Sequence, residues 1–369
     1  MSKLQPFRVY NPEHPNLPTK IFGGKASGIR DYDNIKYPIL LQYNKDLFGE
    51  YWIEDEVKLG KDIEEYKNKL TESERKVFNY VTGSLNWLDS IASDFNAVLL
   101  LATSDPSLRS VIALILSFEV LHNRSYQYLT STMLNDLEKK EAFEKVRHLP
   151  LLVERNNLII PKIDKMIKVF AEYILSSMLG KPKEIDDYFL QTAFEGIIAY
   201  QALEGLFFSG GFVYFHSLAR DNKMLESNSL INMIKTDENQ HSEIFGLIVQ
   251  MLMSEFPQLN TQENMDYAMN FFRQCVEAEK KWSAWLFKDI DTLSIKEYHD
   301  YVEYLANLLC RNAGMNEPYP ENKELKSRWI ATYGSKKRSK DKDQIVSRTD
   351  FLQANSINYT HEGGEDFDL

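Results

Sequence analysis

Residues 117–126 read SFEVLHNRSY and residues 236–245 read TDENQHSEIF, and each stretch contains one Glu-x-x-His pair. A spacing of three residues places the two side chains of a pair on one face of a helix, about one turn apart. The pairs are Glu119 with His122 and Glu238 with His241. Both lie on apolar stripes, where ionised carboxylates are costly to bury unless a metal or another cation neutralises them. The two stretches therefore predict two buried helices that carry metal ligands.

Two further acids complete a pattern that is typical of dinuclear metal sites. Carboxylate-bridged dimetal bundles take one Glu-x-x-His pair from each of two helices and one further acid from each of two others. Asp89, in NWLDSIASDF, and Glu204, in AYQALEGLFF, lie on the inward faces of two more helix-like segments. Oxygen-rich ligation with only two imidazoles favours iron or manganese over zinc or copper. The predicted ligands are Asp89, Glu119, His122, Glu204, Glu238 and His241.

An alternative interpretation treats these acids as surface charges and the two histidines as ordinary core residues with hydrogen-bond partners. Any one of the six, taken alone, fits that interpretation about as well as it fits a metal site. The matching helical register of all six favours the metal site.

Helical periodicity continues along most of the chain. Thr71 and Glu74 resemble a capping box that opens a long helix toward Leu100. Further long helices are predicted at about 106–133, 151–180, 186–219, 224–255, 261–288 and 294–313. Long helices with short connections, and without strand-like alternation, predict an all-α fold built as an antiparallel helical bundle.

Composition divides the chain into three parts. Residues 1–40 are rich in Pro, Gly, Asn and Asp and predict an extended N-terminal arm. Residues 41–332 form the predicted bundle. Residues 333–369 are polar, end in HEGGEDFDL, and are expected to be a mobile tail.

The pair Gly210-Gly211 interrupts the predicted helix just after Glu204, where each glycine costs about 1 kcal/mol relative to alanine. Tight helix packing is the plain explanation. We also hypothesise that the stretch is locally distorted and lets Glu204 change its coordination, because helix distortions often occur at functional sites.

Bulk composition narrows the class of protein. The 369 residues carry a formal net charge of −11, which disfavours binding to nucleic acid or to acidic membranes. The N-terminus lacks the apolar core of a secretory signal, and no stretch approaches the roughly 18 apolar residues of a membrane span. The two cysteines, Cys275 and Cys310, lie far apart in helix-like sequence. We therefore expect a cytoplasmic protein with reduced thiols.

Four segments resemble the motifs of the class I ribonucleotide reductase small subunit, over roughly residues 40–315. The segments are LDSI at 88–91, EVLHNRSY at 119–126, ALEGLFFSGGF at 202–212 and DENQH at 237–241. The resemblance implies a ferritin-like bundle with two metal ions, in which an oxidised metal pair generates a tyrosyl radical. A separate large subunit then uses the oxidising equivalent to reduce ribonucleotides. The sequence leaves diiron, dimanganese and mixed iron–manganese pairs open.

The same resemblance implies roles for individual residues. Asp89, Glu119 and His122 would bind largely one metal. Glu204, Glu238 and His241 would bind the other, with Glu119 and Glu238 able to bridge. The radical site and its relay would comprise Tyr126 as the radical residue, Phe208, Phe212 and Ile234 as its apolar pocket, and near-surface Trp52 with Asp237 as the link to His122. Without the resemblance, Trp52 would be read as a core aromatic and Asp237 as a solvated acid.

The tail acquires a role from the resemblance as well. Family members dock on the large subunit through their last residues and carry a redox-active tyrosine there, for which Tyr359 is the candidate. Phe367 and Leu369 are apolar anchors in an otherwise acidic end, although a tail without function remains the alternative. The resemblance also implies a homodimer and leaves open a flavoprotein activator.

Two other functions use similar ligands. One is a ferritin-like oxidase or oxygenase that acts on a bound apolar substrate, and the other is a non-enzymatic iron-storage bundle. Tyr126, the Trp52–Asp237 pair and the acidic-aromatic tail argue against the oxidase, and the long tail and the tyrosine pocket argue against storage.

Overall fold

The computed structural model describes residues 3–4 and 10–334, and the regular structure in these ranges is helical. The only β pairing among the described residues is an isolated bridge between Lys3 and Glu184. The elements are α1 (Pro38–Gly49), η1 (Glu54–Glu56), α2 (Gly60–Asn68), α3 (Glu72–Ala102), α4 (Pro106–Met133), α5 (Asp136–Val146), α6 (Pro150–Asn156), α7 (Ile160–Met178), α8 (Asp187–Ala202), η2 (Leu203–Phe207), α9 (Ser209–Arg220), α10 (Leu225–Glu255), η3 (Pro257–Leu259), α11 (Gln262–Leu286), α12 (Ile295–Asn312), η4 (Pro320–Asn322) and α13 (Arg328–Gly334).

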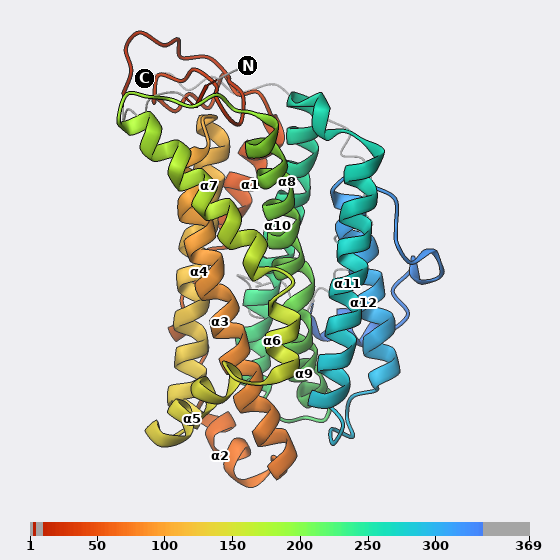
Figure 1. The fold of residues 1–369 in the computed structure, drawn as a ribbon. Coiled ribbons are helices and arrows are strands. Elements are labelled where there is room, and N and C mark those ends of the chain that lie inside the picture. Colours follow the sequence, from red (N-terminus) through yellow and green to blue (C-terminus); the bar gives the residue numbers. More distant parts are fainter. Residues whose placement is uncertain (1–2, 5–9, 335–369) are drawn as a thin grey trace, which may run out of the picture.

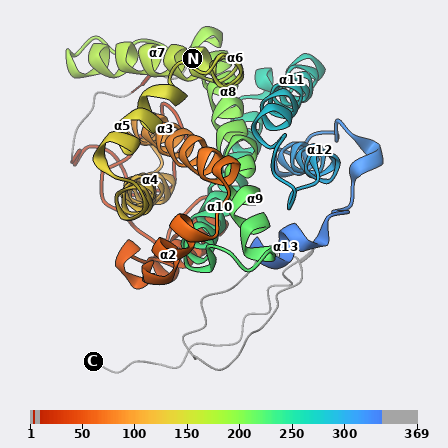
Figure 2. The ribbon, with the colours of Figure 1, turned by 90° about the horizontal axis from the view of Figure 1, so that it is seen from below.

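The long helices run side by side and form a bundle (Figure 1). Figure 2, which looks along the bundle, shows α3 and α4 on one side, α8, α9 and α10 in the middle, and α11 and α12 on the other side. Contacts between α3 and α4, between α8 and α10, and between α11 and α12 join these layers internally, while α10 also contacts α4 and α12. The all-α bundle predicted from the sequence is confirmed.

Two caps determine where the first pair of long helices begins. Thr71 Oγ1 accepts a hydrogen bond from the Glu74 amide at 3.1 Å, and the Glu74 carboxylate accepts one from the Thr71 amide at 2.8 Å. This reciprocal capping box, predicted from the sequence, opens α3. Asp105 caps α4 by accepting from the amides of Ser107 and Leu108. These caps determine where α3 and α4 begin, and the acids Asp89 and Glu119 lie well inside the two helices.

One predicted helix is wrong in its extent. The segment predicted as a single helix at 151–180 is two helices, α6 and α7, separated by residues 157–159. Pro161 lies in the first turn of α7 and has no amide hydrogen, so it is tolerated there but would break a continuous helix. The short helices α1, α2 and α5 were not among the predicted elements.

The stretch Asp187–Arg220 is a continuous apolar helical stretch at the centre of the bundle and comprises α8, η2 and α9. By length and composition alone it is apolar enough to cross a membrane, but 94% of its most apolar window is buried inside the protein. Its middle part, η2, is a π-helical segment that contains Glu204. The apolar character therefore serves the core, and the one acid within η2 faces that core.

Candidate metal centre

Four elements each bring part of the predicted ligand set to one point in the bundle. Helix α3 carries Asp89, α4 carries the first Glu-x-x-His pair, η2 carries Glu204, and α10 carries the second pair. All six side chains are at most 2% exposed. The structure thus brings together Asp89, Glu119, His122, Glu204, Glu238 and His241.

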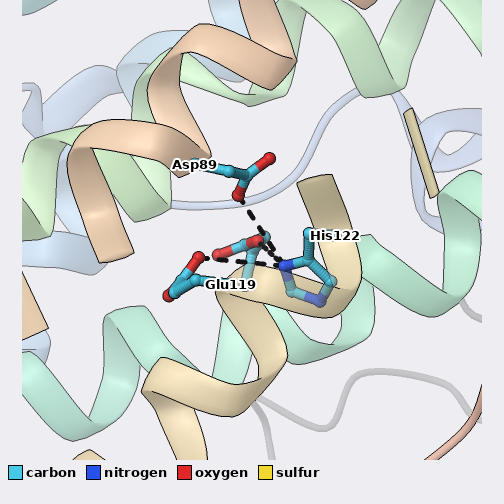
Figure 3. Close-up of side chains that lie close together, drawn as sticks. Asp89, Glu119 and His122 are labelled. Carbon is cyan, nitrogen blue, oxygen red and sulfur yellow. Dashed lines mark ion pairs between the residues drawn. The ribbon is translucent and has the colours of Figure 1, made fainter. Parts of the chain in front are cut away.

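The six residues form two overlapping groups whose ligand atoms lie within 4.8 Å of one another. One group contains Asp89, Glu119, His122 and Glu238, and the other contains Glu119, Glu204, Glu238 and His241. Figure 3 shows the carboxylates of Asp89 and Glu119 turned toward the ring of His122. Because Glu119 and Glu238 belong to both groups, the arrangement fits a dinuclear site with two shared carboxylates.

Both histidines direct the same ring nitrogen at the acids. Nδ1 of His122 lies 2.7 Å from Glu238 Oε1 and 3.8 Å from Asp89 Oδ1. Nδ1 of His241 lies 3.3 Å from Glu119 Oε1 and 3.7 Å from Glu204 Oε2. This shared orientation leaves Nε2 of each ring for contacts on the far side.

Four carboxylates buried together favour the binding of a cation. Burial raises the pKa of Asp89 and of Glu204 well above their usual values, and neighbouring carboxylates raise both further. Neither oxygen of Asp89 or of Glu204 has a hydrogen-bond partner among residues 3–4 and 10–334. In the part of the chain that the structure describes, no lysine or arginine forms an ion pair with any of the six residues. Unpartnered carboxylate oxygens at full burial fit two bound metal ions.

On the far side of His122, Asp237 joins the imidazole to Trp52. Nε2 of His122 lies 3.1 Å from Asp237 Oδ2, and the Trp52 indole N–H donates to that same oxygen at 2.7 Å. The Trp52 ring stacks with the His122 ring at a centroid distance of 6.0 Å. Trp52 is 2% exposed, so its indole is buried beside His122. A carboxylate bound to the outer nitrogen fixes the orientation of a metal-binding histidine and raises its basicity.

Tyr126 lies one helical turn beyond His122 on α4 and is fully buried. Its hydroxyl has no hydrogen-bond partner among the described residues. Burial raises the pKa of Tyr126 well above its usual value, and the charges of Asp89 and Glu238 add to this effect. The pocket residues predicted for it, Phe208, Phe212 and Ile234, are at most 4% exposed. The phenol is therefore isolated from water and held neutral.

From the sequence we hypothesise a local helix distortion at Gly210-Gly211 that acts on Glu204. The distortion is present, but it lies in η2 and contains Glu204 itself. The glycines follow it, and both are explained by packing. A Cβ at Gly210 would lie 2.8 Å from Glu279 Oε1, and a Cβ at Gly211 would lie 2.8 Å from the Leu85 side chain.

Two polar residues beside the metal cluster were not among the predicted site residues. The Tyr200 hydroxyl donates to Glu119 Oε1 at 3.0 Å and accepts from Asn96 Nδ2 at 2.5 Å. Tyr200 precedes Glu204 by four residues, which places both on one helix face, and this spacing was the available signal. The spacing does not predict that Tyr200 bonds to Glu119 on α4.

The family comparison decides among bundles of this kind. The profile of the family described as "Ribonucleotide reductase, small chain" matches residues 30–326. The chain belongs to this family. A Halalkalibacterium halodurans ribonucleoside-diphosphate reductase subunit beta is 29% identical over 97% of this chain and 96% of its own length. The Treponema pallidum protein of the same name is 28% identical over 92% of this chain and 90% of its own length.

A solved relative extends this to the fold. The ribonucleotide reductase R2 subunit from Clostridium botulinum shares 25% identity, covers 90% of this chain and 99% of its own, and superposes with a TM-score of 0.79. The ribonucleotide reductase resemblance and the ferritin-like fold inferred from the motifs are confirmed. Tyr359, Phe367 and Leu369 lie outside the described residues.

Proposed function

We propose that this small-chain family member generates and stores the oxidising equivalent for ribonucleoside-diphosphate reduction by a separate large subunit. One observation carries the proposal. A fully buried tyrosine, which has no hydrogen-bond partner in the described part of the chain, lies one helical turn from a histidine of a cluster that fits two metal ions. Storage of metal requires no such phenol, whereas a stable tyrosyl radical requires isolation from water and from other donors.

In this proposal Asp89, Glu119 and His122 hold mainly one metal, and Glu204, Glu238 and His241 hold mainly the other. Glu119 and Glu238 would be shared between the two metals, which is supported by their membership of both groups. When bound, an iron or manganese pair would supply the oxidising power, with dioxygen or another oxidant as the source. The oxygen-rich donor set supports iron or manganese and does not choose between them.

The protein's own residues would control how the equivalent is held and moved. Tyr126 would hold it, with Phe208, Phe212 and Ile234 excluding water. Asp237 keeps Nδ1 of His122 turned to the carboxylates, because it occupies Nε2. The same Asp237 oxygen accepts from the Trp52 indole, so this hydrogen-bonded chain is the proposed route for an electron toward the site.

The partners are proposed from family membership. The chain would act with the large subunit, docking through the tail at 333–369, with Tyr359 relaying the equivalent between the proteins. We propose a homodimer in the cytoplasm, with activation by a flavoprotein where manganese is used. Residues 335–369 lie outside the described residues, so these assignments rest on the sequence.

The test is a pair of tyrosine variants on one helix. Tyr126→Phe keeps the ring packing and removes no ligand, so metal content should stay unchanged. The radical signal in electron paramagnetic resonance and nucleotide reduction with the large subunit should both fall to background. Tyr128→Phe is the matched control, since the Tyr128 hydroxyl bonds to the Val57 carbonyl away from the site. Full reductase activity in Tyr126→Phe would show that the metal pair itself stores the oxidant.

A further inference from the structure

A buried polar network contacts the end of the π-helical segment from the side of the bundle that carries no proposed metal ligand. Arg155 on α6 donates from Nη1 to Glu279 Oε2 on α11 at 2.7 Å. The same Nη1 donates to the carbonyl oxygen of Phe207, the last residue of η2, at 3.3 Å. The guanidinium also lies 4.7 Å from the centroid of the Phe207 ring. One arginine therefore contacts both the backbone and the side chain at the end of η2.

A second branch reaches the preceding residue of η2. The Tyr298 hydroxyl, on α12, donates to Glu279 Oε1 at 2.8 Å. The Ser209 hydroxyl lies 2.9 Å from the Tyr298 hydroxyl and 2.6 Å from the carbonyl oxygen of Leu206, and its single proton serves one of these two contacts at a time while Tyr298 donates to Glu279. The last two carbonyl groups of η2 thus lie within hydrogen-bond distance of side-chain donors. We refer to Arg155, Ser209, Glu279 and Tyr298 as the η2 clamp.

The physical need for such contacts follows from π-helical geometry. A change from i,i+4 to i,i+5 bonding and back disturbs the backbone ladder at the ends of the π turn. A buried carbonyl group without a partner costs about 1–3 kcal/mol. The Leu206 carbonyl also accepts from the Phe208 amide, so the Arg155 bond to the Phe207 carbonyl is the contact by which another element acts on the end of η2.

Two features indicate that the clamp positions η2 and does not mainly stabilise the fold. All four clamp residues are at most 5% exposed, and a buried ion pair such as Arg155–Glu279 often stabilises a fold less than apolar side chains of similar volume. Gly210 also admits the clamp, since a Cβ there would lie 2.8 Å from Glu279 Oε1 and 3.0 Å from the Tyr298 hydroxyl. A glycine directly after η2 lets charged and phenolic groups approach the backbone.

We propose that the η2 clamp consists of positioning residues that hold the π-helical register of η2 and so set where Glu204 enters the metal centre. The inference rests on the proposed role of Glu204 as a ligand. It assigns to α6, α11 and α12, which supply no ligand, a defined effect on one half of the site.

The experiment compares full-length variants that remove single clamp bonds. Tyr298→Phe removes one hydroxyl, Ser209→Ala removes the other, and Tyr301→Phe on the same helix is the matched control. In metal-free protein, hydrogen exchange of peptides covering 203–212 should quicken about tenfold in both clamp variants, with peptides from α3 unchanged. Tyr301→Phe should leave both regions unchanged.

The second readout is Co²⁺ titration, followed by the ligand-field absorption of the bound ion. Both clamp variants should weaken one of the two binding events about tenfold or more and shift its absorption band, because residues behind a ligand typically change metal affinity to that degree. Glu204→Gln should alter the same event. Glu279→Gln changes the bonds to both Arg155 and Tyr298. The test rests on Tyr298→Phe and Ser209→Ala, so it stands even where Glu279→Gln does not fold.

The outcomes separate the two hypotheses. Unchanged exchange at 203–212 in both clamp variants overturns the clamp. So does an unchanged Co²⁺ spectrum in clamp variants when Glu204→Gln does alter that spectrum. If Glu204→Gln itself has no effect on Co²⁺ binding, the ligand assignment in the proposed function fails, while the exchange data still decide whether the clamp holds η2.

Discussion

Tyr200 donates a hydrogen bond from its hydroxyl to Oε1 of Glu119 across 3.0 Å, with both side chains fully buried. The tyrosine is itself held on two sides, because Asn96 donates to its oxygen and its ring stacks on Phe95 at a centroid distance of 4.1 Å. One oxygen of a proposed bridging carboxylate therefore has a fixed donor before any metal binds. The arrangement parallels Asp237 and His122 on the other side of the cluster.

Tyr200→Phe should lower metal affinity by about 10-fold while leaving the capacity for two ions intact, since the ring stays packed and only the donor to Glu119 is lost. Competition of Mn²⁺ or Fe²⁺ binding against a chelator measures this. Tyr214→Phe is the control, because the Tyr214 hydroxyl bonds to the Glu74 carbonyl away from the ligands. Equal affinities in the two variants would remove Tyr200 from the site.

His241→Ala should reduce the metal bound per chain below two ions and should shrink the rise in melting temperature that metal produces. The stabilisation by a bound ion grows with the logarithm of its affinity, so losing a ligand reduces that increment. Metal analysis and thermal unfolding, with and without EDTA, give both quantities. His148→Ala, at an exposed histidine, is the control. Glu238→Ala should behave as His241→Ala does, and unchanged metal content in both would show that the ligand set is wrong.

His216 should make the metal-free protein less stable as the pH falls below about 6.5. Its Nδ1 lies 2.7 Å from Asn228 Oδ1, and its Nε2 has no partner among the described residues. Burial lowers the pKa of His216 well below its usual value, and the charge of Lys235 lowers it further. The unfolded chain then binds a proton that the folded chain does not, so this contribution to the unfolding free energy falls by about 1.4 kcal/mol per pH unit below 6.5.

The His216→Gln variant isolates that effect, because glutamine retains a donor for Asn228 and does not titrate. Urea unfolding at pH 7.5, 6.5 and 5.5 should show a steeper loss of stability in the unaltered protein than in the variant. Parallel losses would mean that His216 does not set the acid response.

Deleting residues 355–369 should abolish turnover with the large subunit and leave metal content and any Tyr126 radical normal. A polar segment contributes little to the core, yet it can order on a partner through apolar anchors such as Phe367 and Leu369. Tyr359→Phe should separate the roles, since it should keep affinity for the large subunit and block radical transfer. Turnover by the truncated protein would contradict both assignments and favour a self-contained oxidase.

The sequence by itself determined the fold class, the family and all six proposed ligands. This was possible because the deciding signals are local. Three-residue spacing on a helix specifies a shared face, and apolar neighbours at helical period specify that the face is buried. Thr71 and Glu74 likewise needed only each other to form the cap of α3.

The tertiary structure decided which ligands are shared between the two groups and which side chains contact those ligands. Glu119 and Glu238 belong to both ligand groups only because α4 and α10 pack side by side, and no pattern within either helix contains that information. The partners of Tyr200 and Arg155 lie 81 and 124 residues away along the chain. The proposed support of η2 is also tertiary, since the Arg155 donor to the Phe207 carbonyl comes from α6. Local periodicity specifies a helix and its buried face, whereas pairing between faces depends on the energy of contacts that form only when distant segments meet.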